Sequence, residues 1–222
     1  MPTILLFGAG KSATYLIDYL ADSCGDGSRK LLVADLDPAL AAAKLKGRLH
    51  TEALGVNLEQ EESRQQLIRQ ADVVISMLPA GLHPILAADC LKLGVHFFTA
   101  SYESEALRAM RSEIEAKDLL FLNECGLDPG IDHMSALKII HEAKAKGEVI
   151  RSFKSYCGGL LAPESEDNPW KYKFTWNPRN VVLAGQGTSK FLDHGEVKLV
   201  PYQQLFKRVE TIRFPGFGDF DG

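Results

Sequence analysis

The fold is decided by one short stretch near the start of the chain, which reads Thr3-Ile4-Leu5-Leu6-Phe7-Gly8-Ala9-Gly10-Lys11-Ser12-Ala13. Its apolar first half is typical of a buried strand, and a helical pattern follows it. Gly8 would permit a tight turn, and Gly10 would let a pyrophosphate approach the backbone where the helix begins. Ala13 stands where this motif carries glycine or alanine. The stretch therefore predicts a strand, a dinucleotide-binding loop and a helix, although such a turn can also merely join two elements.

A carboxylate at the end of the second predicted strand supports dinucleotide binding. Asp35 lies about as far downstream as the acidic residue that binds the adenosine ribose hydroxyls in such folds. Because a carboxylate there repels a 2′-phosphate, the sequence favours NAD over NADP. Asp37 is an alternative ligand, but it could instead cap the helix that starts at Pro38.

The rest of the first half alternates strand and helix patterns, which predicts a parallel sheet built from βαβ units. Apolar runs occur at 3–7, 31–34, 73–78, 95–99 and 119–122, with a weaker one near 53–58, and helical patterns occur at 11–22, 38–46, 60–70, 82–93 and 104–117. We expect an α/β fold with a Rossmann-type, doubly wound parallel sheet over residues 1–125.

The pattern changes near Gly126, where we expect a second, α+β domain over residues 126–222 that is incomplete. A helix is predicted from about 131 to 146, followed by a strand over 149–156. Aromatic residues alternate farther on, as in a half-buried strand, at Trp170, Tyr172, Phe174 and Trp176.

Composition limits the partners of the chain of 222 residues. Hydrophobic residues make up 45% and charged residues 24%, and the net charge of −4 does not favour nucleic acid. The four cysteines are widely spaced without a CxxC pair, so we expect no metal site, no disulfide framework and a cytoplasmic location. We see no secretory signal and no apolar run long enough to span a membrane.

Three strand ends carry the candidate ligand-binding residues, because open α/β sheets bind ligands at the carboxyl ends of their strands. Pro79 follows the fourth strand, where it could lie beside the cofactor or simply begin a loop. Ser101 and Tyr102 follow the fifth, and Ser101 could instead cap the helix near Ser104. Asp128 follows the last strand and is a candidate for proton transfer or substrate binding, or a cap for the helix near Gly130.

Several blocks in this order resemble the saccharopine dehydrogenases of the glutamate-forming type, also called saccharopine reductases. The resemblance rests on Gly126-Leu127-Asp128-Pro129-Gly130-Ile131-Asp132-His133, Ser155-Tyr156-Cys157-Gly158-Gly159-Leu160, Ala162-Pro163-Glu164, Asn168-Pro169, Tyr172-Lys173-Phe174-Thr175-Trp176, Val74-Ile75-Ser76-Met77-Leu78-Pro79 and Thr99-Ala100-Ser101-Tyr102. It implies an enzyme of lysine metabolism that oxidises saccharopine with a nicotinamide cofactor to an imine. Water then releases glutamate and 2-aminoadipate 6-semialdehyde. It also implies a Rossmann domain followed by a substrate domain, commonly in a homodimer.

The resemblance also implies roles for individual residues. The pyrophosphate loop would be Gly8, Ala9, Gly10, Lys11 and Ser12, with Asp35 setting cofactor choice and Leu78 and Pro79 near the ribose and nicotinamide. Substrate-side positions would be Ser101, Tyr102, Asp128, Pro129 and Gly130. Proton transfer and water addition would involve Tyr102, Asp128 and Cys157. From the residues alone, Cys157 could be a small buried side chain, Asp132 could favour the helix dipole, and His133 is more simply explained by packing than by catalysis.

The sequence also departs from the family pattern, at Leu161, at Ala80 and at the pair Val56-Asn57. The resemblance further implies that an arginine for a substrate carboxylate would follow the segment Pro215-Gly216-Phe217. Two other functions therefore stay open: a related reductase of the carboxynorspermidine type, and a non-catalytic nucleotide-binding module.

Overall fold

The computed structural model describes residues 1–159, 161–175, 179, 186–205, 207, 211–214 and 218–221. The chain divides into two compact units, Met1–Cys157 and Gly158–Gly222, and each is described by itself. The predicted domain boundary at 125/126 falls inside the first unit, because the helix that follows the sheet is grouped with it.

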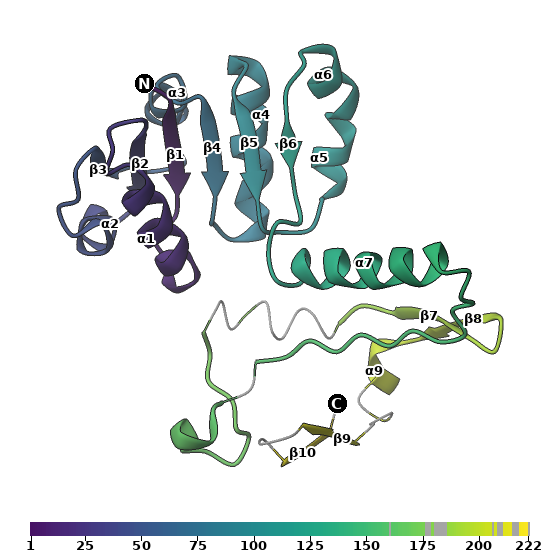
Figure 1. Cartoon of the computed structure of the whole chain (residues 1–222). Helices are drawn as coiled ribbons and strands as arrows, with labels where there is room; N and C mark the ends of the chain where they lie inside the picture. Colours follow the sequence, from purple (N-terminus) through teal and green to yellow (C-terminus); the bar gives the residue numbers. More distant parts are fainter. Residues whose placement is uncertain are drawn as a thin grey trace. The chain divides into compact units, whose positions relative to one another are not determined.

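The first unit is built on a six-stranded sheet (Figure 1). Its strands are β1 (Thr3–Phe7), β2 (Lys30–Asp35), β3 (Thr51–Gly55), β4 (Val73–Ser76), β5 (His96–Thr99) and β6 (Phe121–Leu122). All neighbouring strands are parallel, in the order β3-β2-β1-β4-β5-β6. This order is that of a Rossmann fold and confirms the predicted doubly wound sheet.

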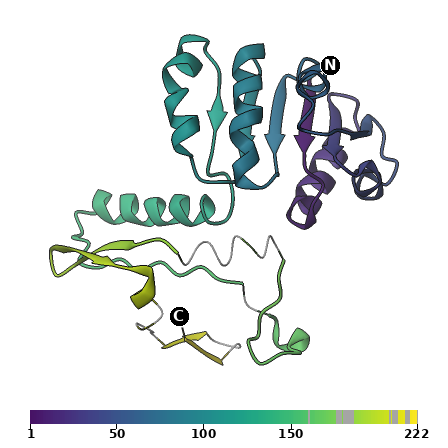
Figure 2. The same ribbon diagram turned by 180° about the vertical axis from the view of Figure 1, so that it is seen from behind.

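Helices cover both faces of the sheet, as Figures 1 and 2 show. They are η1 (Lys11–Ala13), α1 (Thr14–Ser23), α2 (Pro38–Leu45), α3 (Glu61–Ile68), η2 (Ala80–Leu82), α4 (His83–Leu93), α5 (Glu105–Ala109) and α6 (Arg111–Ala116). Side chains alternate along β1: Leu6 packs in the core under α1 and α2, whereas Leu5 and Phe7 pack in the core under α3, α4 and α5. Burial on both faces explains why the central strands are almost continuously apolar.

The helix predicted over 104–117 is two short helices in the structure. Ser104 caps α5, since its hydroxyl accepts a hydrogen bond from the Leu107 amide at 3.3 Å. Met110 then separates α5 from α6, because its amide bonds to Leu107 only three residues back and tightens the turn. This local change of hydrogen bonding is not visible in the apolar spacing.

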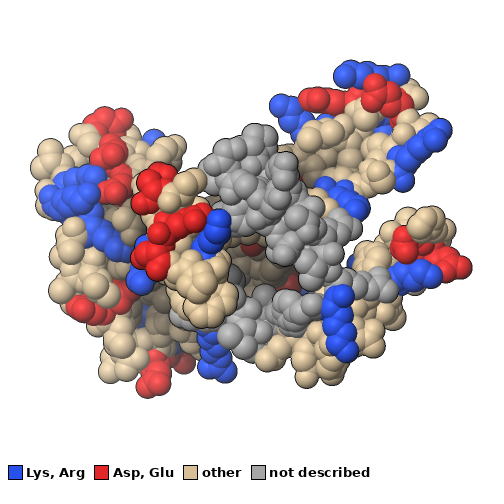
Figure 3. Space-filling model, turned by 90° about the horizontal axis from the view of Figure 1, so that it is seen from below, with Lys and Arg blue, Asp and Glu red and all other residues tan. Residues whose placement is uncertain are grey.

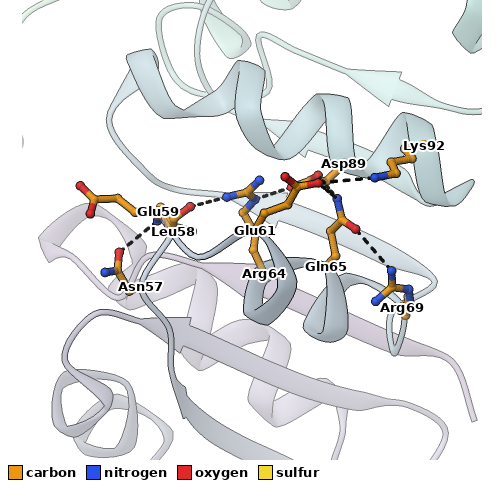
Figure 4. Close-up of polar contacts among 9 residues, drawn as sticks. All are labelled: Asn57, Leu58, Glu59, Glu61, Arg64, Gln65, Arg69, Asp89 and Lys92. Carbon is orange, nitrogen blue, oxygen red and sulfur yellow. Dashed lines mark hydrogen bonds and ion pairs between the residues drawn. The ribbon is translucent and has the colours of Figure 1, made fainter.

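A buried ion pair joins α3 to α4 (Figure 4). Arg64 and Asp89 are both buried, and the guanidinium donates to the Asp89 carboxylate and to the Leu58 carbonyl. The Gln65 amide nitrogen donates to the other Asp89 oxygen at 2.7 Å and to Glu61 at 2.8 Å. The pair is therefore well satisfied by hydrogen bonds, which a buried charge requires.

Beyond the sheet, α7 (Ile131–Ala145) confirms the predicted helix, although no residue in it is buried. The strand predicted over 149–156 is wrong. A strand needs a neighbour for its backbone groups, and no strand in the described part of the chain pairs with this segment.

The second unit contains η3 (Pro163–Ser165), α9 (Tyr202–Leu205) and two antiparallel pairs. These are β7 (Ser189–Asp193) with β8 (Glu196–Val200), and β9 (Thr211–Phe214) with β10 (Gly218–Asp221). The predicted aromatic strand is also wrong over its described part: Trp170 and Phe174 are exposed and Tyr172 packs edge-to-face on Phe174, while Trp176 lies outside the described residues. Within the ranges that the structure describes, no helix is both long and apolar enough to cross a bilayer.

Candidate active site

The glycine turn lies between the ends of three strands, where only glycine fits at its first position. The Gly8 amide donates to the Ala34 carbonyl at 2.8 Å, and Gly8 has φ +99°. A Cβ on Gly8 would lie 3.0 Å from the backbone carbon and oxygen of Met77. Gly10, by contrast, would direct a Cβ into open space, so its backbone can be approached by a ligand. This cradle fits the predicted pyrophosphate loop.

Asp35 supports this loop directly. One carboxylate oxygen accepts from the Ala9 amide at 2.7 Å, and the other accepts from the Asp37 amide at 3.0 Å. Asp37 itself caps α2 by accepting from the Ala39 amide at 3.0 Å, so the capping alternative for Asp37 is confirmed. The predicted ribose ligand is thus also the residue that fixes the shape of the glycine turn.

Lys44 on α2 is a cation beside the loop that the sequence analysis missed. Its ammonium donates to the Gly10 carbonyl. Burial lowers the pKa of Lys44, while the negative charges of Asp35 and Asp18 oppose that shift. No sequence signal pointed to Lys44, because it reaches the loop only through the packing of α2.

The ends of β4 and β5 are joined by His83, which the sequence analysis also missed. Its Nδ1 lies 2.8 Å from the Ser76 hydroxyl, and its Nε2 lies 2.8 Å from the Ser101 hydroxyl and 3.1 Å from the Thr99 hydroxyl. Ser101 therefore does not cap α5, where Ser104 takes that role. Leu78 packs at the edge of the core and Pro79 is exposed at the start of η2, both at the strand end that was predicted to face the cofactor.

Burial lowers the pKa of His83 to about 4, so its ring is neutral at physiological pH. The unfolded chain binds a proton below a pKa of about 6.5 and the native protein does not, so stability is lost as pH falls from about 6.5 to about 4. We expect this loss to be on the order of 3 kcal/mol in the wild type and to be absent in His83→Gln. Urea unfolding of both proteins at about pH 7 and pH 4.5 tests this, and parallel losses in the two proteins would contradict it.

Tyr102, Asp128 and Cys157 come together, as the resemblance implies. The Tyr102 hydroxyl donates to Asp128 at 2.8 Å, and this bond, with burial, raises the pKa of Tyr102 to about 12. Burial raises the pKa of the Cys157 thiol, as do the charges of Asp128 and Asp132 and a hydrogen bond with Asp128. At neutral pH two protonated groups therefore face one exposed carboxylate.

The turn around Asp128 is held by its own backbone rather than by Asp128. The Asp128–Pro129 peptide bond is cis, and the Pro129 carbonyl accepts from the Gly126 amide at 2.8 Å. Gly130 has φ +148°, and a Cβ there would lie 2.2 Å from the Gly126 oxygen. Gly130 is therefore required by close backbone contact, and a Cβ on Gly126 would be crowded, at 3.2 Å from the Pro129 oxygen.

Asp128 is not a helix cap, and that alternative is wrong. Asp132 instead accepts from the Gly130 amide at 2.9 Å and from His133 at 2.7 Å. Burial opposes these bonds, but the net effect lowers the pKa of Asp132. His133 is exposed and contacts this neighbouring carboxylate, which fits a structural role. Among the residues that the structure describes, no three His, Cys, Asp or Glu side chains gather as a metal site would need.

The sheet order, the glycine cradle and Asp35 define a Rossmann domain that binds a nicotinamide dinucleotide. Two family models match the chain: "Saccharopine dehydrogenase NADP binding domain" over residues 4–122 and "Saccharopine dehydrogenase C-terminal domain" over residues 126–222. The chain belongs to the saccharopine dehydrogenase family.

Individual relatives agree with the family. The chain is 36% identical to "Saccharopine dehydrogenase [NADP(+), L-glutamate-forming]" of Saccharomyces cerevisiae over 96% of its own length and 47% of that protein. It is 33% identical to "Alpha-aminoadipic semialdehyde synthase" of Arabidopsis thaliana, over 98% of this chain and 22% of that one. A solved structure of the apo, histidine-tagged saccharopine dehydrogenase (L-Glu forming) from the same yeast superposes with a TM-score of 0.84 at 34% identity, covering 98% of this chain and 48% of that one. The chain thus spans about half the length of the yeast enzyme, and less of the plant protein.

Proposed function

We propose that the protein carrying this chain interconverts saccharopine with glutamate and 2-aminoadipate 6-semialdehyde, using a nicotinamide cofactor. The observation that carries the proposal is the group Tyr102, Asp128 and Cys157 at the same sheet edge as the glycine turn. Breaking a carbon–nitrogen bond by way of an imine needs a proton to be taken from water and a proton to be returned to the departing nitrogen. The Asp128 carboxylate, held by two hydrogen-bond donors, can carry that proton from one to the other.

The Asp128 carboxylate and its two hydrogen-bond donors have different tasks in this mechanism. A bound nicotinamide would exchange a hydride with the substrate carbon next to the secondary amine. Asp128 stabilises the positive charge that develops on the substrate nitrogen, and it accepts a proton from the water that adds to the imine carbon. Tyr102 and Cys157 stay protonated, since both pKa values are raised, and they hold the carboxylate in place by donating to it.

The direct test is turnover by the full-length protein. Saccharopine and NAD should give NADH and glutamate in equal amounts, and the reverse reaction should consume NADH when glutamate and the semialdehyde are supplied. A full-length protein that binds NAD but gives no saccharopine-dependent NADH would contradict the proposal. Turnover measured with a panel of substrates that includes the amine and aldehyde of carboxynorspermidine synthesis distinguishes a saccharopine dehydrogenase from the related reductase.

We propose that NAD is the preferred cofactor, although the matching family model and the yeast relative are both named for NADP. The end of β2 supports NAD, because Asp35 and Asp37 flank the exposed Leu36 and would repel a 2′-phosphate. Lys44, the cation beside the loop, already has partners, because its ammonium donates to the Gly10 carbonyl and interacts with the negative charge of Asp35.

Asp35→Asn should lower the ratio of kcat/KM for NAD to kcat/KM for NADP by about tenfold to a hundredfold, because it removes a charged acceptor for the ribose hydroxyls. The amide oxygen can still accept from Ala9, so the turn should keep its shape. The ratio of kcat/KM for NAD and NADP in wild type and variant measures this. A wild type that prefers NADP would refute the proposal.

A homodimer and a cytoplasmic location also stay predictions, which sedimentation and cell fractionation can test. Acidic and basic side chains are interspersed over the face drawn in Figure 3, in keeping with the net charge of −4 and with a small amino-acid substrate as the expected partner.

A further inference from the structure

We propose that His83 is a positioning residue that holds Ser101, and through it Tyr102, at the substrate side of the site. The inference rests on the proposed function, because Ser101 and Tyr102 are the substrate-side residues at the end of β5. It assigns a task to a buried group that the mechanism above does not use.

His83 links the side chains at the ends of two neighbouring strands, β4 and β5, where Ser76 lies opposite Thr99. Its ring is buried, and so are its partners Ser76, the last residue of β4, and Thr99, the last residue of β5. Nδ1 is bonded to Ser76, whereas Nε2 is bonded to Ser101 and Thr99. Each ring nitrogen thus serves a different strand.

A purely space-filling role would not need this arrangement. Burying an imidazole and hydroxyls costs free energy that an apolar cluster of similar shape avoids, unless every polar group is bonded. Here each nitrogen has a hydroxyl partner, so the cluster is satisfied and fixes the orientation of all its members.

Ser101 is held on its other side by the backbone that leads to Asp128. The Ser101 carbonyl accepts from the Glu124 amide at 3.0 Å, and the Thr99 carbonyl accepts from the Cys125 amide at 3.3 Å. The next residue, Tyr102, donates to Asp128. The segment 99–102 is therefore fixed between His83 and the turn that carries the catalytic carboxylate, and loosening one side should misplace the substrate.

Two substitutions of His83 distinguish the role of Nδ1 from the role of Nε2. Asparagine places a polar atom near the position of Nδ1 and so keeps a partner for Ser76 while losing Ser101. Glutamine reaches the position of Nε2 and keeps a partner for Ser101 while losing Ser76. His83→Asn should raise the KM for saccharopine about tenfold or more in the full-length protein, with the affinity for NAD little changed. His83→Gln should retain most of the wild-type KM.

His96→Gln is the matched control. His96 begins the same strand, β5, and its Nδ1 accepts from the Leu120 amide at 3.1 Å at the opposite edge of the sheet. We expect this variant to keep the wild-type KM even if its melting temperature falls as far as that of His83→Asn. Equal effects of His83→Asn and His83→Gln on KM, or a loss that follows melting temperature in all three variants, would overturn the inference.

Hydrogen exchange gives a second measurement that does not need turnover. The amides of Glu124 and Cys125 should exchange faster in His83→Asn than in the wild type, and at the wild-type rate in the other two variants. A wild type without saccharopine turnover would defeat the proposed function, and exchange alone would then decide the inference. Unchanged exchange in His83→Asn would overturn it.

Discussion

Replacing Asp128 with asparagine should lower kcat for saccharopine by about 10²- to 10⁴-fold in the full-length protein, the range for loss of a general acid or base. The substitution keeps the size of the side chain and can still accept the Tyr102 hydrogen bond, so the turn should survive. It removes the charge that stabilises the substrate iminium and the base that takes a proton from water. Steady-state kinetics at saturating substrate measures the effect.

A spectroscopic signature belongs to the same variant. The pKa of Tyr102 is raised to about 12, first by its bond to Asp128, so losing the carboxylate should move it back toward 10. NMR of ring-labelled tyrosine reports this titration without any turnover. Asp132→Asn is the control, because this carboxylate lies in the same turn but serves Gly130 and His133. A kcat loss as large in Asp132→Asn as in Asp128→Asn would contradict a specific role for Asp128.

Replacing Asp89 with alanine should lower the free energy of unfolding by about 3–5 kcal/mol, since it leaves the Arg64 guanidinium buried without its counter-charge. Denaturant unfolding measures this loss. Lys92→Ala is the control on the same helix, α4: the exposed Lys92 ammonium lies 3.4 Å from the exposed Glu61 carboxylate, and such pairs contribute less than about 1 kcal/mol.

The double variant Arg64→Met with Asp89→Leu separates the cost of an unpaired charge from the value of the pair. Because apolar residues of similar size often replace a buried ion pair with little loss, we expect it to be more stable than Asp89→Ala alone. A double variant that is less stable than the single one would show that the pair itself, with its hydrogen bonds to Gln65 and Leu58, stabilises the fold.

The sheet could be predicted from sequence because its signals are local. Strands covered on both faces are continuously apolar, and Gly8 and Gly10 mark the turn without reference to any distant part of the chain. Asp35 could be found for the same reason, by its distance from the turn. Tyr102 and Asp128 could be found as candidates because each follows the end of a strand. Cys157, and the meeting of all three side chains, were expected only from the family resemblance, since nothing in their spacing along the chain shows that they meet.

The residues that sequence reasoning missed are those placed by packing. Lys44 reaches the Gly10 carbonyl from α2, and His83 reaches the Ser101 hydroxyl from the start of α4. Neither residue has a neighbour in sequence that reveals its task. The strand predicted over 149–156 failed for a related reason. Its alternation resembles a strand, but pairing is decided by the presence of a partner, and periodicity carries no information about that.

The central place of β1 has a consequence for how the chain assembles. β1 (Thr3–Phe7) precedes the other strands of the sheet along the chain, yet it pairs on one side with β2 and on the other with β4, where Ile4 lies opposite Val73. Closing that long loop must precede the pairing, so the middle of the sheet cannot form until the chain has been synthesised as far as Ser76. The glycine turn, although it directly follows β1 in the sequence, takes its final shape only then, because Met77 forms one of its walls.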